Sequence, residues 1–465
     1  MANPFRNLPS VNQLLESPPL KKIVDTVNHS YVVTGVRSFL DDLRQRVSQT
    51  VEAIDLPGPQ ELAQQIAEWL RTKRPSAMRT AINGTGIILH TGLGRAPLAD
   101  AAVERLAATA GYTNLEIDLA TGERGQRGEI VRQLLRDVTG ADDALVVNNN
   151  AAATMLTLMN LARDKEVIVS RGQLVEIGGH YRLPEIIATS GCRLREVGTT
   201  NKTRLSDYEQ ALGPNTGALL HVHTSNYRIV GFQESVSIEA LATLGRRHRI
   251  PVVDDIGSGA VVDFSKYGLQ GEPTVQASLA AGADAVLFSG DKLLCGPQCG
   301  IILGTSEWIA QVAAEPMMRA FRVDKLTLAA LSATLELHLD PTRAERDLPL
   351  LQMLSTPLAN LEFRAKKLAE MLGAVSNLKT VEPQPSEAML GGGSVPDQTI
   401  PSWSVAITLR AQSVQHYAAL LRGQNPSVVG RIDSDRLILD LRTIHPKYDV
   451  EIVQVIEQLA SSESA

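Results

Sequence analysis

Lys292 is the side chain of this sequence that is best placed to act as a nucleophile. It stands in Ser289-Gly290-Asp291-Lys292, directly after the apolar run 285–289. Burial lowers the pKa of a lysine because it disfavours the charged ammonium, and the neutral amine can form a Schiff base with an aldehyde. A lysine in water keeps its proton, and for a lysine considered alone this is the simpler interpretation. The role of Lys292 therefore depends on the elements around it.

Two adjacent carboxylates, Asp254 and Asp255, end a second apolar run, which begins at residue 251. The tight turn Gly257-Ser258-Gly259 follows them. A carboxylate at the edge of a sheet can hold the proton of a pyridinium ring. Metal binding and a plain helix cap remain open as alternatives for this segment taken alone.

Three asparagines, 148–150, precede the small residues Ala151, Ala152 and Ala153, which predicts a strand end that runs directly into a helix. The backbone N–H groups and the dipole of a helix start suit a phosphate, although small residues there also serve close packing of the helix on the sheet. No GxGxxG motif follows a predicted strand and no GxxxxGK[ST] motif occurs, which argues against a dinucleotide or P-loop site. The order of phosphate-binding helix, aspartate strand and lysine loop resembles the large domain of type I pyridoxal-phosphate enzymes.

Seven short apolar runs alternate with helical stretches between about residues 81 and 305. They cover 144–147, 167–170, 194–197, 218–222, 251–254, 285–289 and 300–304. Continuous apolar runs separated by helices predict a mostly parallel sheet with helices on both faces. Ligands of such sheets bind beyond the carboxyl ends of the strands, so the polar residues after each run are the first candidates for chemistry.

The two ends of the chain have other patterns. Apolar residues recur at helical spacing between residues 10 and 73, with a possible capping box at Ser10 and Gln13, and prolines divide this part into short helices. This predicts a small helical bundle. After residue 346 we expect a smaller α+β domain, with a helix near 348–372 and a loop rich in Gly, Pro and Ser at 383–395.

The composition is that of a folded, globular protein. The chain has 465 residues, of which 44% are hydrophobic and 21% charged, and its net charge of −6 argues mildly against a nucleic-acid binder. The first residues contain no apolar stretch typical of a signal peptide, and no run is long enough to span a membrane, so we expect a cytoplasmic protein without membrane contact. Three cysteines at irregular spacing predict reduced thiols rather than a disulfide framework.

Longer strings carry a more specific resemblance. They stand at 82–86, 90–98, 176–179, 196–201, 224–227, 255–259 and 289–292, and continue at 319–325, 328–335, 401–403 and 430–443. Two of them are His90-Thr91-Gly92-Leu93-Gly94-Arg95 and Arg319-Ala320-Phe321-Arg322. In these strings the sequence resembles the bacterial selenocysteine synthases, the family of L-seryl-tRNA(Sec) selenium transferases. The resemblance runs through most of the chain.

This resemblance implies roles for individual residues. Lys292 would carry pyridoxal 5'-phosphate as a Schiff base, and Asp255, rather than Asp254, would face the ring nitrogen. The other cofactor contacts would be Asn150, Ala151, Ala152 and Ser289 at the phosphate, and Tyr181 or His180 stacked on the ring. Arg95, Arg319 and Arg322 would hold the anionic selenium donor, because guanidinium groups suit a tetrahedral oxyanion. Asp291 completes the expected catalytic residues, and no metal is expected.

The resemblance also implies a reaction, partners and domains. The reaction would be a β-replacement in which selenium from selenophosphate takes the place of the hydroxyl of seryl-tRNA(Sec). Residues 1–72 would form a helical tRNA-binding domain, 73–94 a linker, 95–345 the cofactor-binding core and 346–465 the α+β domain. The chain would assemble into a ring of dimers, a homodecamer, whose subunits share active sites.

Several alternatives stay open at this stage. A related pyridoxal-phosphate lyase that eliminates from an amino sugar acid phosphate could use the same arginines for its substrate phosphate. A non-catalytic tRNA-binding or scaffold protein is a further alternative, against which Lys292 and Asp255 argue. His221 and His223 could be a metal pair, but without a third ligand we interpret them as structural. We interpret Cys295 and Cys299 as buried packing residues near the cofactor.

Overall fold

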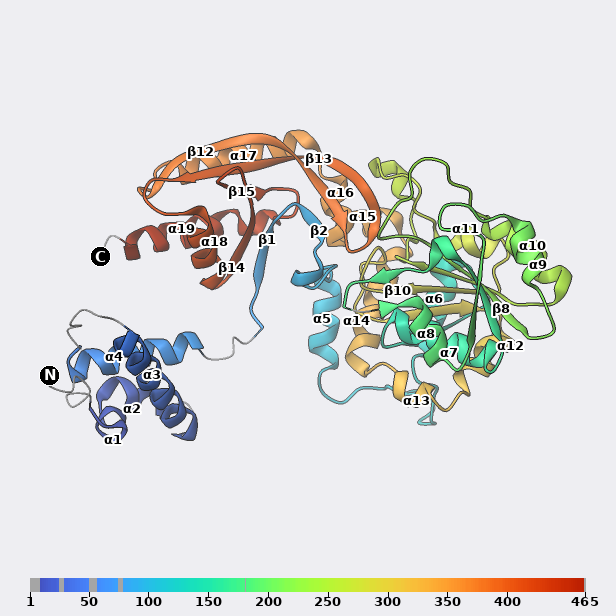
Figure 1. Ribbon diagram of the computed structural model, residues 1–465, viewed down its shortest axis with the longest axis horizontal. Coiled ribbons are helices and arrows are strands. Elements are labelled where there is room, and N and C mark those ends of the chain that lie inside the picture. Colours follow the sequence, from blue (N-terminus) through green and yellow to red (C-terminus); the bar gives the residue numbers. More distant parts are fainter. Residues whose placement is uncertain (1–8, 25–28, 50–56, 74–77, 180, 464–465) are drawn as a thin grey trace. The chain divides into compact units, whose positions relative to one another are not determined.

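The computed structural model describes residues 9–24, 29–49, 57–73, 78–179 and 181–463. The chain divides into two compact units, Met1–Thr80 and Ala81–Ala465, which are treated separately below. Figure 1 shows the elements of both units. Within the described ranges, none of the helices combines the length and the apolar character that crossing a bilayer requires.

The first unit is a helical bundle, as the sequence predicted. Its helices are α1 (Val11–Leu15), α2 (Pro18–Val24), α3 (His29–Gln49) and α4 (Pro59–Lys73). The predicted capping box is present, because Ser10 and the Gln13 side chain satisfy each other's backbone N–H groups. The apolar core joins all four helices, and the absent side chain of Gly35 lets α3 approach α4, since a Cβ there would lie 2.2 Å from Leu70 Cδ2.

A seven-stranded sheet is the centre of the second unit. Its order is β3-β11-β10-β9-β8-β4-β7. The strands are β3 (Asp143–Val147), β4 (Glu166–Ser170), β7 (Arg193–Val197), β8 (Thr216–Val222), β9 (Val252–Gly257), β10 (Ala285–Ser289) and β11 (Gly300–Gly304). Every predicted apolar run is therefore a strand. The strands from β10 to β7 pair in parallel, whereas β11 runs antiparallel to both of its neighbours.

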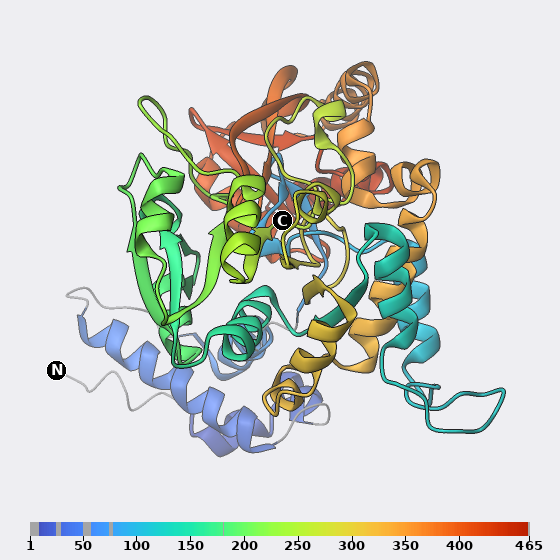
Figure 2. The same cartoon turned by 90° about the vertical axis from the view of Figure 1, so that its right-hand side faces the viewer.

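Helices cover both faces of this sheet (Figures 1 and 2). One face packs against α7 (Asn150–Ala162), α8 (Leu183–Thr189) and α12 (Ser306–Ala313). The other packs against α6 (Glu129–Thr139), α9 (Leu205–Ala211), α10 (Ile238–His248), α11 (Val275–Ala280) and α14 (Lys325–His338). Successive strand residues alternate between these cores, as Val146 and Val147 do, because strand side chains point to opposite faces. Burial on both sides explains the continuous apolar runs.

A second, six-stranded sheet has the order β1-β14-β15-β13-β12-β2. Its strands are β1 (Ala81–Gly84), β2 (Ile87–Leu89), β12 (Leu378–Gly391), β13 (Ser394–Leu409), β14 (Ser427–Asp433) and β15 (Arg436–Asp440). The remaining elements of the unit are α5 (Asp100–Thr109), β5 (Glu176–Ile177), β6 (Tyr181–Arg182), α13 (Met318–Phe321), α15 (Pro341–Asp347), α16 (Pro349–Ser355), α17 (Leu358–Leu372), α18 (Val414–Gly423) and α19 (Asp449–Glu463).

Three expectations for these flanking segments differ from the structure. The expected linker 73–94 contains β1 and β2, which belong to the six-stranded sheet. The expected helix 348–372 is two helices, α16 and α17, separated at Pro357, which cannot continue a helix from the preceding turn. The predicted loop 383–395 is wrong, because this segment belongs to the long hairpin of β12 and β13.

The prolines of that hairpin explain the error. Pro383 and Pro385 pair with β13 on one side, while the neighbour on the other side, β2, pairs with β12 only at Met389 and Gly391. At the prolines β12 is thus an edge strand, where a missing N–H removes no ladder hydrogen bond. A composition typical of loops is compatible with a strand at this place.

Candidate active site

A pocket of about 420 Å³ lies where the carboxyl ends of β8, β9 and β10 meet the start of α7. We call it the Lys292 pocket. Most of the predicted site residues line it, namely Arg95, Asn150, Ala151, Tyr181, Asp255, Ser289, Asp291 and Lys292. The position agrees with the rule that ligands of parallel sheets bind beyond the strand ends.

Asp255 is buried at the end of β9 and points towards α7. Its carboxylate accepts hydrogen bonds from Asn150 Nδ2 at 2.8 Å and Thr154 Oγ1 at 3.0 Å. Burial raises the pKa of Asp255, and these two hydrogen bonds and the charge of Lys292 oppose the rise. The adjacent Asp254 instead lies 2.7 Å from His221 Nδ1 and does not line the pocket. The strand alternation therefore brings only one of the two candidate carboxylates into the site.

Lys292 is 4% exposed and stands in a tight loop after β10. Burial lowers the pKa of its amine, and the charge of Arg95 adds to this, whereas Asp255, Asp291 and Glu272 act in the opposite direction. The loop requires glycine at position 290, where a Cβ would lie 2.4 Å from Cys299 Sγ and 2.9 Å from the Pro297 carbonyl oxygen. Cys295 and Cys299 are fully buried, and burial raises the pKa of both thiols, so they pack rather than react.

The start of α7 presents backbone N–H groups to the pocket. Asn149 caps the helix, and its side chain accepts the N–H of Ala152 at 2.9 Å. The first amides of a helix have no intrahelical acceptor, so those of Asn150 and Ala151 remain for a ligand. Ala152 is buried and does not line the pocket, so the structure does not support it as a direct contact.

Of the two residues expected to stack on the cofactor ring, only Tyr181 can be placed in the structure. Tyr181 lines the pocket, and burial together with the charge of Asp255 raises the pKa of its hydroxyl. His180 lies outside the described residues.

Two family models match this sequence. The model described as L-seryl-tRNA selenium transferase matches residues 81–445, and the model described as Selenocysteine synthase N terminal matches residues 5–44. The chain belongs to the L-seryl-tRNA selenium transferase family. This confirms the resemblance predicted from the sequence strings.

Relatives of this family match along nearly the whole chain. The L-seryl-tRNA(Sec) selenium transferase of Moorella thermoacetica is 46% identical over 98% of this chain and 97% of its own. The protein of the same name from Solidesulfovibrio magneticus is 46% identical over 100% of both chains. Among solved structures, D-glucosaminate-6-phosphate ammonia-lyase is 21% identical with a TM-score of 0.56, covering 83% of this chain and 97% of that chain. At that identity the likeness concerns the fold alone, and it supports the predicted α/β fold with a mostly parallel sheet covered by helices on both faces.

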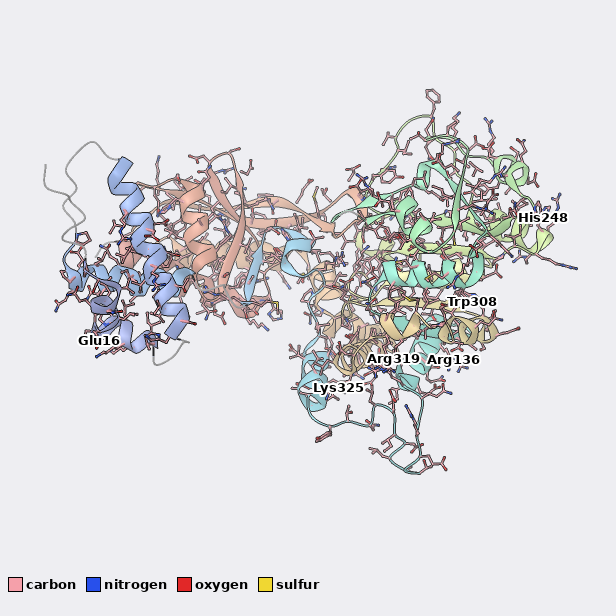
Figure 3. The ribbon with its side chains drawn as sticks, turned by 60° about the horizontal axis from the view of Figure 1, so that its bottom comes forward. Glu16, Arg136, His248, Trp308, Arg319 and Lys325 are labelled. Atoms are coloured by element: carbon pink, nitrogen blue, oxygen red, sulfur yellow. The ribbon has the colours of Figure 1, made fainter. Side chains whose placement is uncertain are left out.

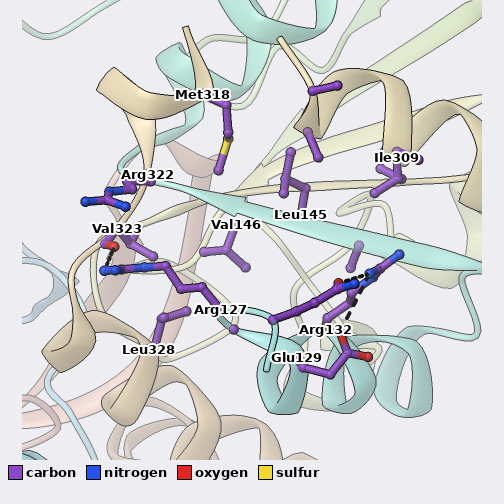
Figure 4. Close-up of a pocket in the computed structure, with 16 residues that line it drawn as sticks. Arg127, Glu129, Arg132, Leu145, Val146, Ile309, Met318, Arg322, Val323 and Leu328 are labelled. Carbon is purple, nitrogen blue, oxygen red and sulfur yellow. Dashed lines mark hydrogen bonds and ion pairs between the residues drawn. The ribbon is translucent and has the colours of Figure 1, made fainter. Parts of the chain in front are cut away.

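The three arginines expected to hold the selenium donor do not all line the Lys292 pocket. Arg95 lines the Lys292 pocket, where its Nη1 donates to Asp291 Oδ2 at 2.8 Å. Arg319 comes from α13 (Figure 3) and does not line that pocket. Arg322 lines another cavity, of about 520 Å³, together with Arg127 and Met318 (Figure 4), which we call the Arg322 cavity.

Sequence reasoning missed some residues of the Lys292 pocket. Thr91, Gly94, His223, Ser225 and Gln298 also line it. Thr91 and Gly94 belong to a string that carried the family resemblance, and Ser225 follows a predicted strand, so both patterns could have found them. His223 was interpreted as structural together with His221, whose ring is indeed paired with Asp254. The two imidazoles therefore have different surroundings.

Proposed function

We propose that this chain is an L-seryl-tRNA(Sec) selenium transferase that replaces the seryl hydroxyl with selenium and uses pyridoxal 5'-phosphate to do so. The observation that carries the proposal is the buried pair of Lys292 and Asp255 in one pocket at the end of a parallel sheet. Full-length similarity to proteins of this name supports the substrate, seryl-tRNA(Sec). Similarity at residues 5–44 as well as 81–445 favours the transferase over the lyase and the non-catalytic alternatives.

The residues of the pocket fit the proposed cofactor. Asn150 Oδ1 and Asp291 Oδ1 are buried polar atoms that have no hydrogen-bond partner among the described residues, which suits a pocket for a polar ligand. The start of α7 would hold the phosphate, Asp255 the protonated ring nitrogen and Lys292 the aldehyde carbon, with Tyr181 at the ring face. When bound, pyridoxal phosphate supplies a sink for the electron pair left on the substrate's Cα.

Each residue of the pocket has a defined task in this reaction. The Lys292 amine, kept partly neutral by burial, accepts the Cα proton. Asp255 accepts the hydrogen bond of the ring N–H, and Asn150 and Thr154 fix its carboxylate in place. Arg95, Arg319 and Arg322 hold the anionic selenium donor, selenophosphate. Since Arg319 and Arg322 do not line the Lys292 pocket of their own chain, they would reach the pocket of another subunit.

A tRNA is too large for the Lys292 pocket alone, so we also propose a tRNA-binding domain and an oligomer whose subunits share active sites. The helical domain of residues 1–72 would hold the tRNA, and its near-neutral charge favours recognition of shape by several subunits together. We propose that the chain forms homo-oligomers, specifically a ring of dimers. Four apolar side chains that are exposed on the single chain support an interface, namely Tyr112, Ile117, Leu119 and Ile130. A cytoplasmic location remains a prediction from the sequence.

Borohydride reduction tests the central assignment. Reduction of the purified protein with bound pyridoxal phosphate fixes the cofactor to the lysine that carries it, and peptide mapping should find the label on Lys292. The same preparation should transfer selenium from selenophosphate to seryl-tRNA(Sec), whereas Lys292→Ala should lose both the label and the transfer. A label on another lysine would reject the assignment, and a labelled protein without transfer would reject the substrate. Lys266→Ala, at a surface lysine that pairs with Glu345, is the matched control.

A further inference from the structure

His223 lies between two cavities of the second unit. It follows β8 and lines the Lys292 pocket, and it also lines a cavity of about 480 Å³. Glu272 lines this second cavity, together with Gln270, Gly271, Tyr227 and Gln398. Gln270 and Gly271 are exposed, so the second cavity reaches the surface of the chain. His223 and Glu272 thus connect the reactive lysine's pocket with a side that faces solvent.

The two side chains face each other with unpartnered polar atoms. His223 Nδ1 lies 4.0 Å from Glu272 Oε1, and the Glu272 side chain is only 1% exposed. Neither Nδ1 nor either carboxylate oxygen of Glu272 has a hydrogen-bond partner among the described residues. A buried carboxyl without partners costs free energy, which a proton on the carboxyl reduces. A small side-chain movement, or one water molecule, would complete a hydrogen bond between them.

The surrounding charges set the protonation of this pair. Burial raises the pKa of Glu272 to about 7. The nearby Ser258 hydroxyl and Val395 N–H, which form no complete hydrogen bond with the carboxyl group, and the charge of Lys292 oppose the rise. Burial lowers the pKa of His223 to about 4, His221 and Lys292 lower it further, and Asp254 opposes them. At neutral pH the imidazole is therefore uncharged, while Glu272 is divided between its protonated and ionised forms.

We propose that His223 donates the proton that the departing seryl hydroxyl needs, and that Glu272 replaces this proton; the proposal rests on the function proposed above. After Lys292 has removed the Cα proton, the electron pair of Cα forms a second bond to Cβ as the Cβ–O bond breaks. The leaving oxygen takes the proton from His223 Nε2 and departs as water. His223 Nδ1 takes the proton of Glu272, whose carboxylate regains one from solvent through the second cavity. His223 is then a catalytic residue, and Glu272 acts through it.

The test compares pH profiles of the cofactor-loaded full-length protein and its variants. Because the Glu272 acid must be protonated, wild-type kcat should fall as pH rises through about 7. Glu272→Gln should lower kcat on the order of 100-fold at pH 6, abolish the fall near pH 7 and leave KM for seryl-tRNA(Sec) unchanged. Glu272→Asp, which keeps a carboxyl, should recover part of the rate. Glu307→Gln, at an exposed glutamate, should match the wild type.

A second measurement does not depend on turnover. Infrared titration of the protein without substrate should show a carboxylic acid C=O band that disappears as pH rises through about 7 and that is absent from Glu272→Gln. If Glu272→Gln does not fold, His223→Gln should show the same loss of kcat. Wild-type kcat and an unchanged pH profile in a folded Glu272→Gln protein would overturn the proposal while leaving the proposed function intact. A wild-type protein that transfers no selenium would overturn both.

Discussion

The Lys292 pocket is built at the ends of adjacent parallel strands, whereas the Arg322 cavity lies at the edge of the sheet, where β3, α6 and α12 line it. In the pocket, Asp255 belongs to β9 and Lys292 follows the neighbouring strand β10, so the hydrogen bonds of the sheet help to fix their separation. In the cavity, Arg322 follows the short helix α13, and Phe321 is tied to the sheet by the hydrogen bond that its carbonyl oxygen accepts from the Asn148 N–H at 2.9 Å. The structure thus brings the residues proposed to hold the cofactor together in one pocket of one chain, whereas Arg319 and Arg322 do not line that pocket.

This difference suggests that the pocket and the cavity have different roles, one in binding the cofactor and the other in binding the selenium donor. The residues proposed to hold the cofactor need a fixed geometry, which a buried sheet supplies. The residues proposed to hold the anionic donor need positive charge, and Arg322 makes no ion pair with any residue that the structure describes. An arginine without a carboxylate partner is available for an external anion. We therefore expect substitutions in the pocket to affect kcat and substitutions in the cavity to affect KM for selenophosphate.

Among the substitutions that distinguish the Lys292 pocket from the Arg322 cavity, Asp255→Asn is expected to have the largest effect on activity. Asparagine keeps the shape of the side chain, but its single oxygen can replace only one of the two carboxylate oxygens that accept from Asn150 and Thr154, and it removes the negative charge that stabilises the ring N–H. We expect kcat to fall on the order of 100-fold to 1000-fold, with little change in KM for selenophosphate. Steady-state kinetics and cofactor absorbance measure this.

Asp254→Asn is the matched control for that substitution. Asp254 is the neighbouring residue, equally buried, and its partner is His221 rather than a pocket residue. The Asp254→Asn substitution should lower thermal stability by weakening the contact with His221, while kcat changes far less than in Asp255→Asn. Equal losses of kcat in the two variants would show that the charge at Asp255 has no special role.

Some features of the fold and the site could be predicted from the sequence, and others could not. The apolar runs predicted all seven strands because burial on both faces leaves a pattern in each strand, and the residues after them included Asp255, Ser289 and Lys292. The approach of Glu272 to His223 left no such pattern, because it depends on how a loop packs over a strand end far away in the chain. The hairpin of β12 and β13 was missed because edge position, not composition, makes its prolines acceptable.

A smaller effect is expected for Arg322→Ala in the Arg322 cavity. Loss of a charged hydrogen-bond donor to selenophosphate should raise KM for selenophosphate about 10-fold to 100-fold and leave cofactor binding unchanged. Mixing subunits tests whether this arginine serves another chain's pocket. Oligomers formed from Lys292→Ala and Arg322→Ala chains should regain activity that neither variant has at low selenophosphate concentration. No recovery, with subunit exchange verified by two different tags, would place both residues in the site of one chain.

The smallest effect concerns a residue that positions Arg322. Arg127 Nη2 donates to the Val323 carbonyl oxygen at 2.7 Å, which holds the backbone next to Arg322 (Figure 4). Arg127→Ala removes this neutral-acceptor hydrogen bond, so KM for selenophosphate should rise about 2-fold to 10-fold with kcat unchanged. Arg124 is the matched control, because it pairs with the same Glu116 but is largely exposed and makes no contact with Val323 among the interactions of the described residues. If Arg124→Ala and Arg127→Ala raise KM equally, the effect comes from the shared ion pair with Glu116, and the carbonyl contact does not set the position of Arg322.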